Sequence, residues 1–259
     1  MNGLTLKTLT FKVNVEAGIE ELMDEVAVEA PVRIYLNEGL YATLMASPSQ
    51  LKELAVGFLL GESVIKSLNE IKQVSVKDGM VKVKLNRNKK LKRPLSKGII
   101  LTACTSGEDF FDRLMELGEE PVESRYSIEA REILRMVREC VKKAETSKAT
   151  GGTHFAGIFE DGTIKAFSED VGRHNAIDKV IGLAALRGVD FQRSVLVSSG
   201  RQPGGMVLKA AKVKIPILAS MRAPLASGVR VAQAFGLTLI GFARGGRRNV
   251  YSFPERVKV

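Results

Sequence analysis

The segment from residue 154 to residue 244 alternates between short apolar runs and stretches of helical period, and this alternation limits the possible folds more than any other feature. Continuous apolar runs occur at 193–199, 215–220 and 237–243, and helix-like stretches separate them. Strands joined by helices favour a mainly parallel sheet with right-handed crossovers and helices on its faces. The sequence therefore predicts an α/β unit over residues 125–259.

This unit begins with two further predicted elements. Residues 127–143 have a regular helical stripe of apolar side chains, and residues 155–167 alternate in the manner of a strand hairpin that turns at Asp161 and Gly162. A helix over 169–187 follows, in which Ile177, Val180 and Ile181 recur at helical spacing.

The first hundred residues indicate a smaller α+β unit. Residues 31–46 and 71–86 are each typical of a hairpin, the second with an Asp-Gly turn at Asp78 and Gly79. Between them, the stretch from Pro48 to Glu62 has the period of a helix, with Ser49 as a possible cap and Gly61 as a stop. We expect a domain over 1–100, a linker over 101–124 and the α/β domain over 125–259.

Composition narrows the class of protein. The 39 Lys and Arg exceed the 29 Asp and Glu and give a net charge of +10, which favours an acidic or phosphorylated partner. A run of basic residues at 82–97 could steer such a partner, although such a run is more often simply the solvated face of a hairpin and its exit loop. No apolar run approaches the ~18 residues of a membrane helix, and no secretory signal is evident. A cytoplasmic protein without a membrane association is the simplest interpretation.

The α/β pattern predicts where a ligand would bind. In open α/β sheets, ligands bind beyond the carboxyl ends of the strands. The loops expected there, 198–205, 220–224 and 244–248, each join small residues to an arginine. Glycine lets backbone amides approach phosphate oxygens and guanidinium groups bind them in bidentate fashion, so these loops favour an anionic ligand. Arginines on the solvent loops of a basic protein are the alternative.

The start of the helix at 169–187 is a second candidate for the same site. Asp170 occupies an expected N-cap position, which would put Arg173, His174 and Asn175 in the first turn, close to unpaired backbone donors. His174 and Asp178 should share a polar face. An ordinary amphipathic helix is equally compatible with this pattern.

The two cysteines differ in context. Cys104 lies in a stretch of small residues shortly after the basic run, whereas Cys140 lies within the predicted helix at 127–143. We expect Cys104 to be accessible and Cys140 to be packed, so Cys104 is the candidate reactive thiol; an unreactive loop cysteine is the alternative.

Several of these stretches together resemble the FdhD family of formate dehydrogenase accessory proteins. The resemblance is carried by GGTHFAG at 151–157, EDVGRHNAIDKVIG at 169–182, SSGRQPGGMVLKA at 198–210 and GFARGGRRNVYSFPERV at 241–257, and it extends to SPSQLKELAVGFLLGESVI at 47–65. It thus covers nearly the whole chain, with EDVGRHNA as its most specific part.

The resemblance implies a fold, a role and partners. The fold would be a cytidine-deaminase-like α/β domain, and the protein would form a homodimer. It would carry sulfur from a cysteine desulfurase to the bis(molybdopterin guanine dinucleotide) cofactor before that cofactor enters the catalytic subunit of formate dehydrogenase. The cofactor would be a bound substrate that GDP mimics, and the protein would have no catalytic metal of its own.

The resemblance also suggests residues for each role. Cys104 would be the catalytic thiol that holds sulfur as a persulfide. The second cysteine of the family's Cys-x-x-Cys loop falls on Gly107 here, so Cys104 would act without a second thiol. The residues predicted to bind the cofactor are Gly151, Gly152, His154, Asp170, Arg173, His174, Asn175, Ser199, Gly200, Arg201, Ser220, Arg222 and Arg244.

Two other functions are weighed against the sulfur carrier. A zinc nucleobase deaminase needs His-x-Glu and a downstream Pro-Cys-x-x-Cys, and residues 154–156 read His-Phe-Ala with no later cysteine. A non-catalytic guanine-nucleotide or RNA binder remains the alternative. Specific nucleic-acid binding is disfavoured because aromatic residues make up only 6% of the chain and Trp is absent, which leaves few stacking surfaces.

Overall fold

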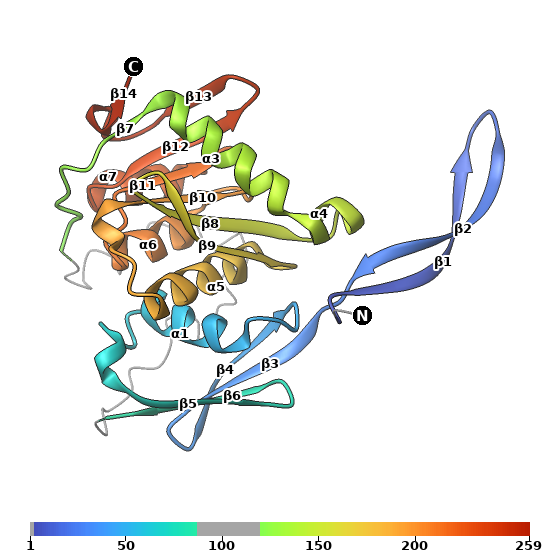
Figure 1. The fold of residues 1–259 in the computed structure, drawn as a ribbon, viewed down its shortest axis with the longest axis horizontal. Helices are drawn as coiled ribbons and strands as arrows, with labels where there is room; N and C mark the ends of the chain where they lie inside the picture. The colour runs from blue at the N-terminus through green and yellow to red at the C-terminus, as the bar shows by residue number, and fades with distance from the viewer. Residues whose placement is uncertain (1–2, 87–119) are drawn as a thin grey trace.

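The structure is a computed structural model that describes residues 3–86 and 120–259 (Figure 1). Cys104 and the part of the basic run beyond residue 86 lie outside the described residues. In the two described ranges, no helix combines the length and apolar character that a membrane span requires.

The chain begins with a long hairpin that the sequence patterns did not lead us to expect. Strands β1 (Thr5–Asn14) and β2 (Gly18–Ala27) pair antiparallel along their whole length. Figure 1 shows that this hairpin projects away from the body of the molecule. We call residues 5–27 the arm.

Both hairpins predicted in the N-terminal unit are confirmed, and they form one sheet. The strand order is β4-β3-β6-β5, with β3 parallel to β6. The strands are β3 (Ala30–Leu36), β4 (Gly39–Ala46), β5 (Ile71–Lys77) and β6 (Met80–Leu85), and a short 3-10 helix, η1 (Leu68–Glu70), precedes β5. Asp78 and Gly79 both have positive φ, as a two-residue hairpin turn requires. Helix α1 (Leu51–Gly61) packs on this sheet; its N-cap is Gln50 and not Ser49.

A six-stranded sheet forms the centre of the second unit, and it corrects the prediction of a mainly parallel sheet. Its order is β13-β12-β11-β10-β8-β9, and only the β12-β11 and β11-β10 pairs are parallel. The strands are β8 (His154–Glu160), β9 (Thr163–Asp170), β10 (Ser194–Ser198), β11 (Ile217–Ser220), β12 (Thr238–Arg244) and β13 (Arg247–Val250). The sheet is mixed because the tight turns at 161–162 and 245–246 fold each adjoining pair of strands back antiparallel. The class is α/β, as expected.

Helices cover both faces of this sheet (Figure 1). Helix α3 packs on one face, and α5, α6 and α7 pack on the other. The helices are α3 (Ala130–Lys143), α4 (Glu145–Thr150), α5 (Arg173–Leu186), α6 (Gly204–Lys212) and α7 (Ala226–Ala234). Minor elements are η2 (Phe191–Arg193), η3 (Pro254–Arg256) and the pair β7 (Ile128–Glu129) with β14 (Val257–Lys258). The helix expected at 169–187 begins only at Arg173, because Glu169 and Asp170 still pair with β8 as part of β9.

Helix α1 crosses α5 at very short range, which joins the two units. Both helices have a glycine at the crossing. A Cβ atom on Gly57 would lie 1.7 Å from the carbonyl oxygen of Asp178, and one on Gly182 would lie 1.9 Å from that of Glu53. One hydrophobic cluster accordingly runs from the N-terminal sheet through α1 to α5 and the six-stranded sheet. The units therefore share a core, while the predicted boundaries at 100 and 125 stay a prediction.

Candidate functional site

The candidate site lies at the edge of the six-stranded sheet where β10 and β11 end. Because these strands are parallel, the loops that follow them lie side by side. The Gln202 backbone N–H donates to the Ala223 carbonyl at 3.2 Å, and the Leu225 N–H donates to the Gln202 carbonyl at 3.0 Å. The Ser220 hydroxyl donates to the Gly200 carbonyl at 2.6 Å. These bonds fix Gly200 and Ser220, two of the residues predicted from the sequence, in one rigid arrangement.

His154 lies at the same edge, on a strand that runs in the opposite direction to β10. It is the first residue of β8, which runs antiparallel to β10, so the start of β8 lies beside the end of β10. The Ser199 hydroxyl oxygen accepts the Phe155 backbone N–H at 2.9 Å and lies 3.3 Å from His154 Nδ1. The structure thus brings His154 and Ser199 together, although 45 residues separate them in the sequence.

Arg173 completes this edge from the first turn of α5. A Cβ atom on Gly200 would lie 2.9 Å from Arg173 Cβ, so only glycine lets the β10 loop pack against this arginine. Burial, and then the neighbouring charge of Arg201, lowers the pKa of the Arg173 guanidinium. Arg173 Nε is buried and has no hydrogen-bond partner among the residues that the structure describes. An unpaired donor of this kind is available to a ligand.

The electrostatic potential at the site is positive. Burial, followed by the charges of Arg173 and Arg222, lowers the pKa of His154. His174, the next residue on α5, is more deeply enclosed: burial and the charges of Lys209 and Arg173 lower its pKa to about 3. Both imidazoles are therefore neutral at pH 7 and can accept or donate a hydrogen bond without adding charge.

Three arginines therefore meet at this edge without acidic partners. In residues 3–86 and 120–259, no carboxylate forms an ion pair with Arg173, Arg201 or Arg222. Guanidinium groups that share one site repel each other, and a bound anion relieves this repulsion through bidentate, charge-assisted bonds. The arrangement is suited to bind phosphate groups.

Asp170 and Asn175, also predicted to bind a ligand, lie buried between the two units. Asp170 forms an ion pair with Lys179 at 2.7 Å and accepts the backbone N–H groups of Ser47 and Gly172 at 3.1 and 2.8 Å. Asn175 Nδ2 donates to the Met45 carbonyl at 2.7 Å. The N-cap of α5 is Gly172 and not Asp170. Both side chains are thus occupied in joining α5 to the N-terminal unit, and their binding role stays a prediction.

Asp178 corrects the expectation of a solvent-facing polar row. It is only 1% exposed, and its carboxylate oxygens accept from Lys209 Nζ at 2.8 and 3.1 Å. Lys209 Nζ also pairs with Glu62 at 2.9 Å. Burial disfavours the lysine charge, but Asp178 and Glu62 outweigh it and raise the pKa of Lys209. Sequence reasoning missed Lys209 and Glu62; a lysine within the apolar stretch of α6 was the available signal.

The remaining predicted residues lie at more exposed positions. Gly151 ends α4 with a φ of 63°, and a Cβ atom on Gly152 would lie 3.1 Å from Cβ of Ala27 at the base of the arm. Arg244 is exposed at the end of β12, in the hairpin with β13. The binding roles of Gly151, Gly152 and Arg244 stay predictions.

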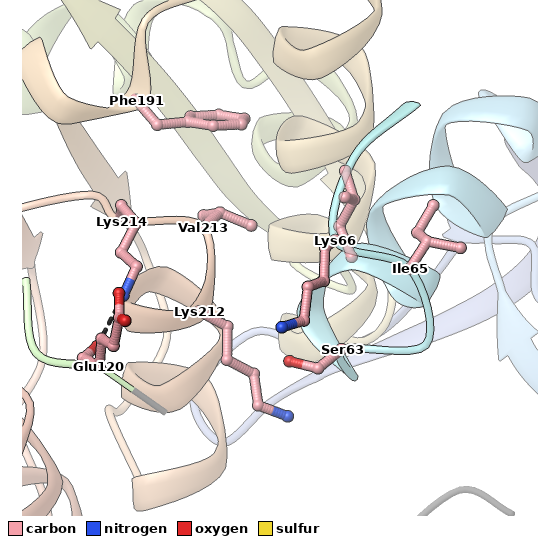
Figure 2. A pocket seen from close by; sticks show the side chains of 9 residues that line it. Ser63, Ile65, Lys66, Glu120, Phe191, Lys212, Val213 and Lys214 are labelled. Atoms are coloured by element: carbon pink, nitrogen blue, oxygen red, sulfur yellow. Dashed lines mark hydrogen bonds between the residues drawn. The ribbon is translucent and has the colours of Figure 1, made fainter. Parts of the chain in front are cut away.

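A separate pocket of about 370 Å³ lies away from this edge, where α1 and α6 end (Figure 2). Ser63, Lys66, Lys212 and Lys214 are among its lining residues, and Lys214 Nζ donates to the Glu120 carbonyl at 2.6 Å. Since α6 starts at the strand-end site and runs away from it, this pocket is at the opposite end of the helix. None of the predicted site residues lines this pocket, so we do not assign it as the functional site.

Cys140 is packed as expected. Its side chain is fully buried beneath β8, where a Cβ atom on Gly157 would lie 2.6 Å from its sulfur. Burial, and secondarily Glu139, raises the pKa of this thiol to about 12. Cys140 is therefore a packing residue without nucleophilic character at neutral pH.

Comparison with known proteins points to one family. Residues 27–258 match the model of the FdhD/NarQ family. The chain is 38% identical over 235 residues to the sulfur carrier protein FdhD of Methanothermobacter thermautotrophicus, covering 90% of this chain and 92% of that protein. It is 31% identical to sulfur carrier protein FdhD of Bacillus subtilis, with 94% of each chain covered. A crystal structure of a candidate formate dehydrogenase accessory protein from Desulfotalea psychrophila superposes with a TM-score of 0.81 at 28% identity, covering 98% of this chain and all of that one.

Proposed function

Because this chain belongs to the FdhD/NarQ family, we propose that it is a sulfur carrier required for formate dehydrogenase activity. It takes sulfur from a cysteine desulfurase and passes it to the bis(molybdopterin guanine dinucleotide) cofactor before that cofactor enters the catalytic subunit. Sulfur transfer takes place in the cytoplasm. The second unit has a cytidine-deaminase-like fold.

The observation that carries this proposal is the burial of Cys140. A sulfur carrier needs a thiolate that attacks the terminal sulfur of a donor persulfide. Cys140 cannot do so, and the sequence contains only one other cysteine, Cys104. In the proposed step, a new S–S bond forms at Cys104, the S–S bond of the donor breaks, and the desulfurase cysteine leaves as a thiolate. The S–S bond at Cys104 would then break as the terminal sulfur passes to the bound cofactor, Cys104 would leave as a thiolate, and the metal of the cofactor, as the substrate, would supply the two electrons that the sulfur gains.

The strand-end site supplies the binding part of the proposal. The guanine dinucleotide portions of the cofactor carry phosphates, which Arg173, Arg201 and Arg222 would bind as anions. Arg173 Nε, buried without a partner among the described residues, fits that role. His154 and Ser199 would orient the ligand by neutral hydrogen bonds. GDP is the simplest probe of this site.

Intact-mass spectrometry tests the carrier role. After incubation with a cysteine desulfurase and cysteine, the wild-type protein is expected to gain the mass of one sulfur atom, removable by a thiol reductant. Cys140→Ala should gain the same mass, because its thiol does not take part, and Cys104→Ala should gain none. A Cys104→Ala protein that still acquires sulfur would refute the assignment. A wild-type protein that binds GDP but never acquires sulfur would favour the alternative, a non-catalytic guanine-nucleotide binder.

The histidine titrations test the binding site. We expect GDP to raise the pKa of His154, since bound phosphate offsets the charges of Arg173 and Arg222 that lower it in the free protein. Proton uptake then accompanies binding, so GDP binds more tightly as the pH falls through the pKa of His154 in the complex. The chain has only two histidines, and NMR can follow both.

His174 is the internal control for this titration. Its pKa of about 3 results mainly from burial, so GDP should change it little. If GDP binds and the His154 resonances keep their pKa, the phosphates bind elsewhere and the assignment of the site is wrong.

A further inference from the structure

Helix α1 ends at the pocket of about 370 Å³ in Figure 2, and its end is unusual. The Ser63 backbone N–H donates to the Leu60 carbonyl at 3.0 Å. The Val64 N–H donates to the Leu59 carbonyl at 2.9 Å. This pair of bonds defines a Schellman motif, in which one residue has a left-handed backbone and is usually glycine. In α1 that residue is Ser63, with a φ of 56°.

Helix α6 ends at the same pocket in the same way. The Lys214 N–H donates to the Ala211 carbonyl at 2.9 Å, and the Ile215 N–H donates to the Ala210 carbonyl at 3.0 Å. Lys214 occupies the usual glycine position, with a φ of 65°. The left-handed region is disfavoured for such side chains, yet both helices carry one there and both line the pocket. Strained backbone of this kind is concentrated at ligand sites.

The charged side chains that line this pocket are mainly cationic. Lys66, Lys212 and Lys214 line it, and Glu120 is the only carboxylate among the described residues that do. Lys214 Nζ donates to the backbone carbonyl of Glu120 and not to its carboxylate. Lysines at a helix C-terminus also complement the helix dipole, but Lys66 lies outside both helices and forms no ion pair within residues 3–86 and 120–259. The cluster therefore favours an anionic ligand.

A neighbouring hollow of about 510 Å³ has a different charge. Glu120 and Glu123 line it, and Lys214 is the one lysine among its described lining residues. An anion is therefore expected in the lysine-lined pocket and not in the larger hollow beside it.

The same pocket also has an apolar wall with an aromatic ring. Phe191 is half-buried, and Val213 and Ile65 lie beside it in the lining. In the view of Figure 2, Val213 lies between the ring of Phe191 and the ammonium group of Lys66. An aromatic face can stack with a planar ring, and the volume is within the range of small-molecule sites. A ligand with a planar ring at one end and an anion at the other matches both walls.

We propose that this pocket binds a mononucleotide, with the base against Phe191 and the phosphate among Lys66, Lys212 and Ser63. Three lysines and one carboxylate leave about two positive charges, which a phosphate monoester offsets at pH 7. The site lies at the opposite end of α6 from the strand-end site, and this inference does not depend on the sulfur-carrier role.

Calorimetry with AMP tests the proposal on the full-length protein. The wild type is expected to bind AMP, and to bind adenosine or ribose 5-phosphate at least about 10-fold more weakly, because each lacks one half of the ligand. Lys66→Gln/Lys212→Gln should weaken AMP binding by at least about 10-fold, the effect of losing bonds to a charged group. Phe191→Leu, which keeps an apolar side chain, should weaken it roughly 10-fold through loss of stacking.

The matched control is Lys72→Gln/Lys77→Gln, which removes the same charge from two exposed positions of β5. It should leave AMP affinity unchanged. A wild type that does not bind AMP, or a control as defective as the pocket variant, would overturn the proposal. Ribose 5-phosphate that binds as tightly as AMP would refute the nucleotide assignment, because the ring would then contribute nothing.

Arg201→Ala separates this pocket from the strand-end site. It should bind AMP as tightly as the wild type does. Loss of AMP binding in Arg201→Ala, with retention in Lys66→Gln/Lys212→Gln, would assign AMP to the strand-end arginines and overturn the proposal.

Photolabelling locates the base directly. AMP with a photoactivatable azide on its base should label the peptide that contains Phe191. Labelling confined to peptides of the strand-end loops at 198–205 and 220–224 would contradict the assignment.

Discussion

A Cys104→Ala variant is expected to leave formate dehydrogenase inactive while it binds GDP as tightly as the wild type. Removing the only thiol able to accept sulfur removes the transfer step itself, so activity in a strain that depends on this protein should fall by at least about 100-fold. The strand-end site does not require that thiol, so calorimetry should give an unchanged GDP affinity. Full restoration of formate dehydrogenase activity by Cys104→Ala would end the carrier role.

Two further variants separate carrier chemistry from ligand binding. Arg201→Ala should retain persulfide formation at Cys104 but bind GDP about 10- to 100-fold more weakly, the effect of losing a hydrogen bond to a charged group. Arg193→Ala is its matched control, because Arg193 pairs with Asp161 at the opposite edge of the sheet. A loss of GDP affinity in Arg193→Ala as large as that in Arg201→Ala would mean that general positive charge, and not the site, binds the nucleotide.

Replacing Gly182 with alanine is expected to destabilise the protein strongly. Alanine is the better helix former by about 1 kcal/mol, which alone would stabilise α5. The added Cβ atom, however, would lie 1.9 Å from the Glu53 carbonyl oxygen and 2.7 Å from the Gly57 nitrogen. Backbone cannot yield as a flexible side chain can, so α1 must move away from α5. We expect a loss of at least about 3 kcal/mol, which corresponds to a drop of roughly 6–12 °C in melting temperature.

Gly205→Ala is the control for this measurement. Gly205 lies in the first turn of α6, and beyond its chain neighbours and the adjacent helix backbone no described atom lies within 4 Å of where its Cβ would be. Its melting temperature should equal that of the wild type or exceed it slightly. A Gly182→Ala protein as stable as the wild type would show that α1 does not cross α5 at the distance the structure gives.

Local sequence patterns correctly predicted those secondary-structure elements that depend only on residues close in sequence. The turn at Asp78 and Gly79 and the stripe of α3 were correct because positive φ and a period of 3.6 depend on residues close in sequence. The arm was missed although Leu9, Phe11 and Val13 alternate, since the alternation had no evident face to bury. The helix at 169–187 was placed too early because an aspartate two residues before a glycine resembles a cap, whereas Asp170 ends a strand.

The candidate site likewise combines features that local sequence predicts with features that depend on contacts between distant residues. The sequence indicated the arginine-bearing loops at 198–205 and 220–224, because an apolar run followed by glycine or serine marks a strand end. It did not separate Arg173, whose Nε is buried without a hydrogen-bond partner among the described residues, from Asp170 and Asn175, which contact Ser47 and Met45. More than a hundred residues separate these partners in the sequence, and no local pattern relates them.

The amino-acid pattern alone was sufficient for the α/β class, the two glycine-turn hairpins of the N-terminal unit and the packed position of Cys140, because burial and turn geometry depend on neighbouring residues. The mixed order of the central sheet, the glycine crossing of α1 with α5 and the burial of Asp178 with Lys209 emerged only in three dimensions. Each of these depends on which surfaces meet, and that is decided by packing between segments far apart in the chain.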